Sequence, residues 1–143
     1  MAKGASIKFK SYEETIPKIL ELMKVNKEIK KYDKIVLKPF LTESQEKSSP
    51  KEFTEAVLKF CLANKNPVAE VFIAEGADGF DTEELFNSFG YKGLAEKYNV
   101  SLIDLNNADT EEITDYHFTK FSSIHYPKIL KDSFIISLPR ITE

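Results

Sequence analysis

Short apolar runs recur along the chain and predict the strands of a sheet. Four of these runs are apolar at nearly every position, which is typical of parallel strands that are covered on both faces. A fifth run, residues 7–10, alternates apolar and charged side chains, so we expect a half-buried or edge strand there. The four apolar runs are residues 34–38, 68–74, 100–105 and 134–138.

A first helix is predicted after residue 10, where apolar residues recur three and four positions apart. Ser11 and Glu14 have the spacing of a capping box, in which each side chain bonds the backbone of the other residue. Pro17 would disturb a helix that begins at Tyr12, because proline lacks a backbone N–H group. We therefore expect this helix to begin nearer Thr15.

The clearest helical pattern covers residues 51–64. Ser49 stands at the expected N-cap and Pro50 at the first helical position, which proline favours. The apolar positions of this segment share one face, and we expect that face to pack on the sheet. The side chains predicted to make this contact are Phe53, Val57 and Phe60.

The second half of the chain is predicted to hold two shorter helices and an irregular link. Asp81 is placed to cap a helix that Gly90 ends, and residues 91–98 predict a further helix. Before the last strand we expect an acidic loop, a hairpin and a helical turn, at residues 106–115, 117–125 and 127–131.

Alternating strands and helices predict the fold class. We expect an α/β domain with three layers, in which helices flank a mainly parallel, Rossmann-like sheet of about five strands. Residues 1–143 are expected to form a single domain. No helix follows the apolar strand 134–138, so three alternatives remain: earlier helices cover it, another subunit covers it, or the chain is the front part of a longer domain.

Composition narrows the range of partners. The chain has 143 residues, 42% of them hydrophobic and 30% charged, with a formal net charge of -3. This charge supplies no basic field for a nucleic acid, and no apolar run approaches the roughly 20 residues that span a bilayer. The first ten residues do not resemble a signal peptide, and we expect a cytoplasmic protein.

The single cysteine, Cys61, falls on the apolar face of the 51–64 helix and is interpreted as a small core residue. One cysteine cannot hold an iron–sulfur cluster. Neither the dinucleotide fingerprint nor a P-loop is present, so no cofactor is identifiable.

Candidate chemistry gathers where the predicted strands end. Parallel α/β sheets bind ligands outside the carboxyl ends of their strands, and helix N-termini favour anions there. We expect Lys38 and Arg140 to supply positive charge to a small anionic molecule. The candidate ligand-binding residues are Lys38, Glu75, Asp78, Asn106 and Arg140.

Each candidate also has a simpler interpretation. Lys38 and Arg140 could be solvated charges or part of an exposed salt bridge. The loop from Glu75 to Gly79 could be a tight turn that leads into the Asp81 cap. The acids near this loop would repel a bare phosphate and suit hydroxyl groups or a bridging cation better.

Metal binding and nucleophilic catalysis find little support. His117 and His125 would share one face of a continuous strand, but no third ligand stands at a recognisable spacing. No G-x-S-x-G elbow positions a nucleophilic serine. We therefore assign no metal site and no catalytic residue.

Several short motifs follow one another in a distinctive order. They are Ile35-Val-Leu-Lys-Pro39, Ser49-Pro50, Ala74-Glu-Gly76, Phe89-Gly-Tyr91, Leu94-Ala95, Val100-Ser-Leu-Ile-Asp-Leu105, Tyr126-Pro-Lys-Ile-Leu130 and the segment from Asp132 to Arg140. From about residue 11 onward this order resembles the domain of unknown function 362 family, whose members typically show a KPN-type strand end, a GY-type helix end and a strand that ends in LPKLKTH.

Two residues that depart from the family pattern follow predicted strands, where the candidate ligand-binding residues also lie. Phe40 stands where the family usually has Asn, and Thr142 stands where a second Lys is expected. The resemblance implies that the family domain continues past this sequence, and that some members carry ferredoxin-type cysteines.

Two interpretations of function follow. The first is a family member that binds a small anionic ligand at the strand ends, with a redox-associated enzyme as the family context. The second is a non-catalytic interaction subunit that docks through its C-terminal strand onto a second copy or another protein.

Overall fold

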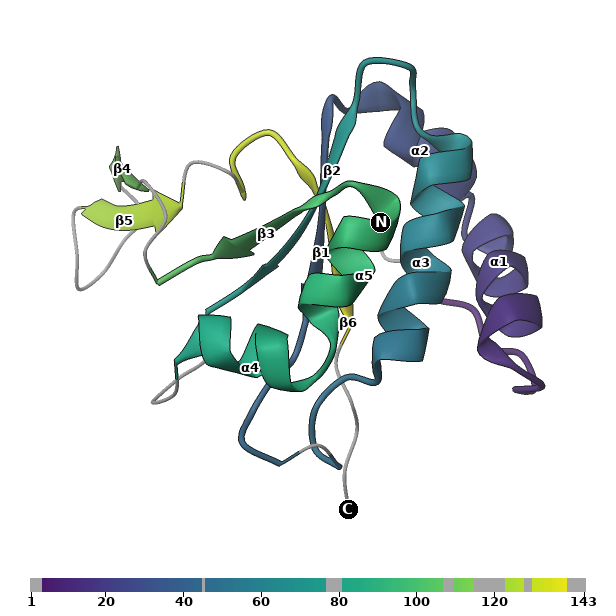
Figure 1. Ribbon diagram of the computed structural model, residues 1–143. Coiled ribbons are helices and arrows are strands. Elements are labelled where there is room, and N and C mark those ends of the chain that lie inside the picture. The colour runs from purple at the N-terminus through teal and green to yellow at the C-terminus, as the bar shows by residue number, and fades with distance from the viewer. Residues whose placement is uncertain are drawn as a thin grey trace.

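A four-stranded parallel sheet forms the centre of the molecule (Figure 1). The computed structural model describes residues 4–44, 46–76, 81–106, 110–114, 123–127 and 130–138, the segments 110–114 and 123–127 by their backbone alone. The strand order is β3-β2-β1-β6, and each neighbouring pair is parallel. The predicted α/β class with a parallel sheet is confirmed. The strands are β1 Lys34–Pro39, β2 Glu70–Glu75, β3 Ser101–Asp104 and β6 Phe134–Leu138.

The carboxyl ends of the four strands meet at one edge of the sheet, which we call the carboxyl edge. Pro39 at the end of β1 pairs with Leu138 of β6. Glu75 at the end of β2 pairs with Asp104 of β3. Residues that are distant in the sequence therefore reach a common edge, as the parallel arrangement requires.

The described helices pack on one face of this sheet (Figure 1). Side chains from all five α-helices or their flanks join one apolar cluster with Ile35, Leu37 and Ile73 of the sheet. The helices are α1 Tyr12–Leu22, α2 Val25–Glu28, α3 Lys51–Asn64, α4 Thr82–Ser88 and α5 Tyr91–Tyr98, and a short 3-10 helix, η1, covers Ile29–Lys31.

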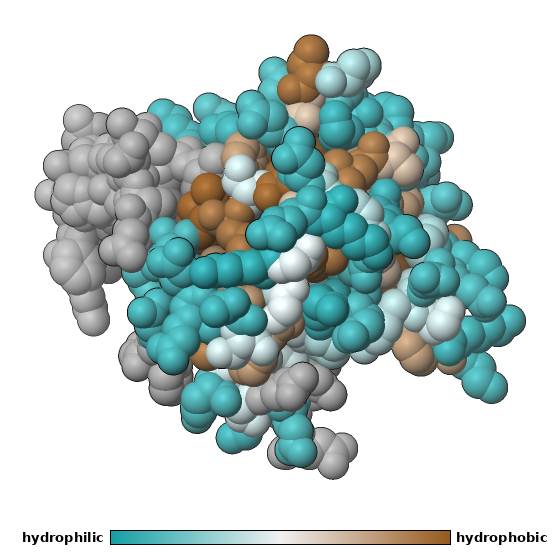
Figure 2. All heavy atoms as spheres, in the orientation of Figure 1, coloured by the Kyte–Doolittle hydropathy of each residue, from teal (hydrophilic) through white to brown (hydrophobic). Residues whose placement is uncertain are grey.

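The second face of the sheet has a smaller cluster. Val36, Ala74 and Leu130 are buried there, and Phe72 and Ile103 are half-buried around them. Figure 2 shows hydrophobic side chains at the surface on the side of β3. We expected helices on both faces, and in the described part of the chain they lie on one.

Residues 7–10 do not form a strand, and this prediction is wrong. The Oγ1 atom of Thr15 accepts hydrogen bonds from the backbone N–H groups of Lys10, at 2.9 Å, and Ser11, at 3.4 Å. These bonds turn the segment onto α1 and take up donors that a sheet would need. Local alternation of apolar and charged residues cannot distinguish this arrangement from an edge strand.

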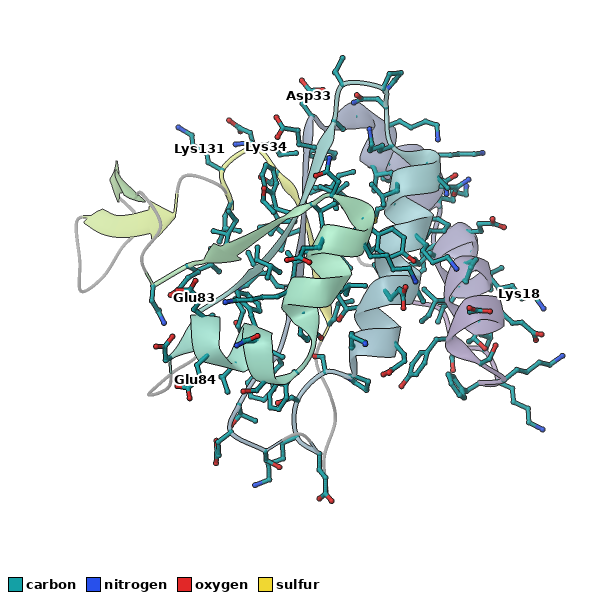
Figure 3. The ribbon with its side chains drawn as sticks, in the orientation of Figure 1. Lys18, Asp33, Lys34, Glu83, Glu84 and Lys131 are labelled. Carbon is teal, nitrogen blue, oxygen red and sulfur yellow. The ribbon has the colours of Figure 1, made fainter. Side chains whose placement is uncertain are left out.

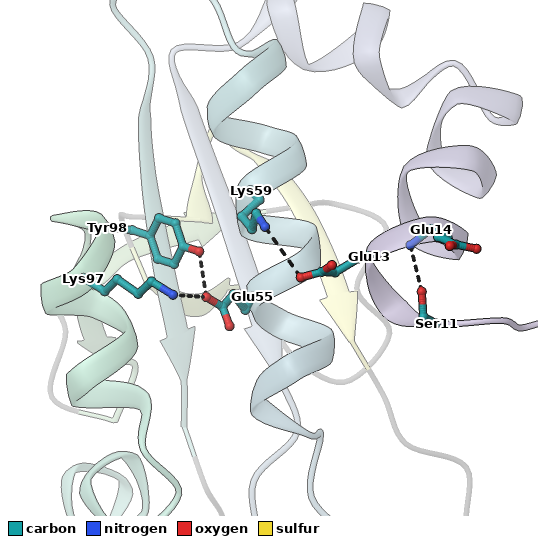
Figure 4. A network of polar contacts seen from close by, with 7 residues as sticks. All are labelled: Ser11, Glu13, Glu14, Glu55, Lys59, Lys97 and Tyr98. Carbon is teal, nitrogen blue, oxygen red and sulfur yellow. Dashed lines mark hydrogen bonds and ion pairs between the residues drawn. The ribbon is translucent and has the colours of Figure 1, made fainter.

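Helix α1 begins at Tyr12, earlier than predicted. The Ser11 hydroxyl accepts a hydrogen bond from the backbone N–H group of Glu14 at 3.1 Å and caps the helix (Figure 4). Pro17 lies inside the helix and removes only one N–H donor. The cap and the apolar face of α1 outweigh that loss.

The predictions for α4 and α5 are confirmed at both boundaries. The Asp81 carboxylate accepts hydrogen bonds from the backbone N–H groups of Glu83 and Glu84. Gly90 has a φ of 81°, a conformation that glycine adopts without strain, and it separates the two helices.

The region before β6 differs from its prediction. The acidic stretch at 110–114 is a strand, β4 Thr110–Thr114, and it pairs antiparallel with β5 Ser123–Pro127. The hairpin therefore covers more of the chain than the predicted residues 117–125. In residues 110–114, backbone pairing outweighs the low strand propensity of Glu. Residues 128–129, within the predicted helical turn, lie outside the described residues.

Helix α3 buries most of its predicted face. Val57 and Phe60 are buried in the core, whereas Phe53 is half-buried and its ring stacks on Tyr12 of α1 at 5.7 Å. Cys61 is fully buried, and burial raises the pKa of its thiol to about 12. The thiol is therefore protonated at neutral pH, in agreement with its predicted place in the core.

Strand β6 is covered on one of its faces. Phe134, Ile136 and Leu138 join the core beneath the helices, so earlier helices supply that cover. Ile135 points to the second face and remains 36% exposed. The predicted uncovered surface is therefore limited to one side of this edge strand.

A polar cluster joins α3 to α5 at the surface (Figure 4). The Glu55 carboxylate accepts hydrogen bonds from the Tyr98 hydroxyl at 2.6 Å and the Lys97 ammonium at 3.0 Å. The Tyr98 hydrogen bond, followed by the Lys97 hydrogen bond, holds the pKa of Glu55 below its ordinary value of 4.5. The cluster therefore favours the ionised carboxylate.

Ser49 is buried at the carboxyl edge and does not cap α3; the predicted cap is wrong. Its hydroxyl accepts a hydrogen bond from the Phe40 N–H group at 2.8 Å and donates one to the Leu138 carbonyl. The Ser49 N–H group donates to the Phe40 carbonyl at 2.7 Å. Pro50 occupies the N-cap position instead, without a side-chain hydrogen bond.

The Tyr91 hydroxyl completes this network. It donates to the Ser49 carbonyl at 3.0 Å and lies 2.9 Å from the Thr54 hydroxyl. Tyr91 is fully buried, and burial is the main reason that the pKa of its hydroxyl rises to about 12. We call Ser49, Thr54 and Tyr91 the serine clasp, because they tie α3 and α5 to the ends of β1 and β6.

Replacing Tyr98 by Phe should destabilise the protein more at neutral pH than in acid. The folded pKa of Glu55 lies below 4.5, so its contribution to the free energy of unfolding is complete above about pH 4.5 and is lost as the pH falls through the lowered pKa. Urea unfolding at pH 7 and at about pH 3 measures the free energy of unfolding of both proteins. The difference between wild type and Tyr98→Phe in this free energy should be smaller at the acidic pH. A matched Tyr32→Phe variant, whose ring packs on Phe134, should show the same small gap at both pH values.

Replacing Ser49 by Ala should cost about 2–3 kcal/mol in the free energy of unfolding, because the Phe40 N–H and Leu138 carbonyl both lose a partner. Chemical denaturation measures this loss. Ser88→Ala, at an exposed serine, is the control and should change stability by less than about 0.5 kcal/mol. Equal stability of the two variants would show that the serine clasp does not hold the strand ends.

Candidate functional site

The structure places three of the five predicted site residues on the carboxyl edge. Lys38 is the last residue but one of β1, Glu75 ends β2, and Asn106 follows β3 by two residues. Asp78 and Arg140 lie outside the described residues. We therefore build the site from Lys38, Glu75 and Asn106.

Lys38 borders a hollow of about 190 Å³ at the ends of β1, β2 and β6. Its side chain is half-buried, and within residues 4–44, 46–76, 81–106 and 130–138 its ammonium group has no hydrogen bond or ion pair. Ser137 pairs with Lys38 in register and brings a hydroxyl to the same side of the sheet. We call this space the Lys38 hollow; its lining residues are Lys38, Pro39, Phe40, Glu75, Ser137 and Leu138.

Glu75 is 8% exposed and uses both carboxylate oxygens to hold the backbone. Its Oε2 atom accepts a hydrogen bond from the Leu41 N–H group at 2.8 Å, and its Oε1 atom accepts one from the Gly76 N–H group at 2.9 Å. Glu75 thereby fixes the chain after β1 and the turn after β2. Its geometry suits shaping the hollow better than orienting a mobile cation.

Asn106 ties the end of β3 to the start of α4. Its side-chain amide donates to the Thr82 hydroxyl at 3.5 Å, and its N–H group donates to the Asp104 carboxylate at 2.9 Å. A Cβ atom on Gly76 would lie 3.0 Å from the Asn106 Oδ1 atom. A side chain at position 76 would therefore require Asn106 to shift by a few tenths of an ångström.

A second hollow, of about 320 Å³, lies at the start of α3 and was not predicted as a separate feature. Helix N-termini present backbone N–H groups that favour anions, and Lys51 adds a positive charge. The negative charge of Glu52 offsets the positive charge of Lys51. The Lys51 side chain runs close to Gly90, since a Cβ on Gly90 would lie 3.1 Å from the Lys51 Cδ atom. The lining residues are Ser48, Ser49, Pro50, Lys51, Glu52, Ser88, Phe89 and Gly90.

The described acidic side chains that come next after β2 in the sequence lie at the start of α4. The Asp81 carboxylate serves as a helix cap, and Glu83 and Glu84 are exposed at the start of α4, far from Asp33 and Lys34 at the start of β1 (Figure 3). In the described part of the chain, no three His, Cys, Asp or Glu side chains gather closely enough to hold a metal ion. The side chains of His117 and His125 lie outside that part.

Two larger hollows lie away from the carboxyl edge. One, of about 560 Å³, separates residues 7–10 from α1, and the other, of about 430 Å³, runs between α1 and α3. The first is lined by three lysines and two glutamates of opposed charge, so no single ligand charge is favoured there. We place the candidate site at the Lys38 hollow, because three strand ends converge on it together with a cation that has no partner among the described side chains.

Comparison with known proteins supports the family and nothing more specific. No curated protein and no solved structure matches the chain. Among the described helices, none is long and apolar enough to cross a membrane. The family model described as "Domain of unknown function (DUF362)" matches residues 35–142, a range that begins at β1 instead of near residue 11. This match covers most of the chain, and the chain therefore belongs to the DUF362 family.

Proposed function

We propose that this protein binds a small anionic ligand at the carboxyl edge, with the Lys38 ammonium as its main positive contact. The observation that carries the proposal is a half-buried lysine whose ammonium group has no partner in the described residues. An ammonium group without a partner can form a charge-assisted hydrogen bond with an anion that enters the Lys38 hollow.

The surroundings of the Lys38 hollow favour a ligand with little negative charge. The chain has a formal net charge of -3, and acids stand on the neighbouring loops. A carboxylate with one charge meets less repulsion there than a phosphate with two. Arg140, which follows β6 by two residues, is proposed as a second cationic contact on the basis of the sequence.

The competing interpretation is that Lys38 is simply a solvated charge at a strand end. Solvation alone would leave the stability of the protein unchanged by added carboxylates. A binding site would instead stabilise the folded state increasingly as the ligand concentration rises. The two interpretations therefore differ in a measurable way.

Thermal unfolding with a panel of small carboxylates and phosphates tests the binding proposal. At a ligand concentration one hundred times Kd, the wild-type Tm should rise by about 5–10 °C. Lys38→Met, which removes the charge and keeps an unbranched side chain, should abolish the rise. Lys34→Met is the matched control, because Lys34 lies on the same strand and face at the opposite edge, and it should keep the rise (Figure 3). A rise that survives in Lys38→Met, or no rise with any compound, would contradict the proposal.

We also propose that β6 docks onto a second copy of the chain. Among the described strands β6 lies at the edge of the sheet, its residues 134–138 carry no charge, and Ile135 is 36% exposed. Natural edge strands are usually protected by charged side chains or proline. An edge of this kind is suited to pairing with another strand.

Light scattering over a concentration series tests this association. Wild type should reach the mass of a dimer, and Ile135→Lys should remain a monomer, because a charge at position 135 would be buried on docking. Val68→Lys puts the same charge on a residue that is 75% exposed in the turn before β2 and should dimerise like wild type. A wild-type protein that stays monomeric at every concentration would rule out docking of a second copy.

A further inference from the structure

The Phe40 side chain stands out on the carboxyl edge, because it is an aromatic ring left in contact with water beside a cation. Phe40 is 50% exposed and lines the same hollow as Lys38. Apolar rings of this size usually lie in the core or at a binding surface. Phe9 is also exposed, at 57%, so exposure alone is not unusual; what distinguishes Phe40 is that it lines a hollow together with the Lys38 ammonium.

The Phe40 backbone is held firmly although its ring is exposed. Its N–H group donates to the Ser49 hydroxyl at 2.8 Å, and its carbonyl accepts from the Ser49 N–H group at 2.7 Å. Ser49 itself is buried and bonded to the Leu138 carbonyl. The ring is thus presented from a fixed backbone, which lowers the entropy lost when a ligand packs against it.

We propose that the ligand of the Lys38 hollow is a small aromatic carboxylate, whose ring packs on Phe40 while its carboxylate contacts the Lys38 ammonium. This inference rests on the proposed anion site and goes beyond it by naming the ligand class. Ser137, in register with Lys38, is placed to donate a hydroxyl hydrogen bond to the same carboxylate.

The lining of the hollow agrees with such a ligand. Pro39 and Leu138 are both buried and form apolar walls, so a flat ring would exchange water for apolar contacts. The volume of about 190 Å³ lies below the usual range for drug-sized ligands. One ring with one charged group is therefore a better match than a nucleotide or a larger cofactor.

The charge balance supports one carboxylate over a phosphate ester. Lys38 supplies a single positive charge in the hollow, whereas Glu75 lines the hollow and has both oxygens bonded to backbone N–H groups. A ligand with one negative charge would match the ammonium and meet less repulsion from Glu75 than a dianion would. Aromatic packing would then supply the remaining affinity and the selectivity.

NMR titration with benzoate and with acetate, using backbone amide signals, tests the inference. In wild type, benzoate should bind about tenfold more tightly than acetate, because an aromatic pair and the burial of a ring add to the shared carboxylate contact. Phe40→Asn should remove this preference and leave acetate binding unchanged. Phe40→Tyr, which keeps a ring, should retain the preference, and Lys38→Met should abolish binding of both compounds.

The outcomes separate the two proposals. Equal affinity of wild type for benzoate and acetate, with both lost in Lys38→Met, would overturn the aromatic inference and leave the anion site standing. The aromatic inference would also fail if Phe40→Asn kept the benzoate preference. Absence of binding by both compounds would overturn the carboxylate site itself, and phenyl phosphate, titrated in parallel, would then show whether a dianion binds at Lys38 instead.

Discussion

One buried hydroxyl group, that of Ser49, reinforces the carboxyl edge, where the ladder between β1 and β6 ends. Parallel strands cannot be joined by tight turns, so the ends of β1 and β6 must be brought together by contacts across the chain. Ser49 makes that contact between Phe40 and Leu138, two residues that it bonds simultaneously, although Leu138 is 89 positions away from Ser49. Tyr91 holds the Ser49 carbonyl from the helix side, and the Thr54 hydroxyl is bonded in turn to the Tyr91 hydroxyl. Within the described residues no buried side-chain nitrogen or oxygen lacks a hydrogen-bond partner, and the Ser49 hydroxyl is part of that complete bonding.

Local signals were sufficient for most elements of the fold. The Asp81 cap, the glycine at position 90 and the apolar run of β1 depend on neighbours within a few residues, so the sequence pattern specified them. Long-range partners could not be inferred in the same way. Ser49 has the sequence context of a helix cap, and only the proximity of Leu138 gives it a different role. Residues 7–10 alternate like a strand, but the Thr15 hydroxyl takes the backbone donor of Lys10.

The candidate site was predictable in place but not in detail. The rule that ligands bind at the carboxyl ends of parallel strands selected Lys38, Glu75 and Asn106, and the structure gathers them at that edge. The rule says nothing about which side chains are already bonded. Glu75 proves to be occupied by two backbone N–H groups, and Phe40 could be noted only as a departure from the family pattern until its exposure was known. Exposure and hydrogen-bond saturation are properties of the packed molecule, and periodicity does not encode them.

The hydrogen bonds already formed at the carboxyl edge limit which groups there remain available to a ligand. Ser49, Glu75 and Asp81 have committed oxygen atoms to backbone N–H groups, so these oxygens are poorly placed to become ligands of a metal ion. The Lys38 ammonium has no such commitment in the described residues, and the Phe40 ring has no apolar cover over half of its surface. A cation and an aromatic ring are thus the groups left available on a rigid frame. The amphipathic anion proposed above would match these two groups, since an ammonium and an apolar ring complement opposite ends of such a molecule. The Ser49 contacts fix the Phe40 backbone, from which the ring extends.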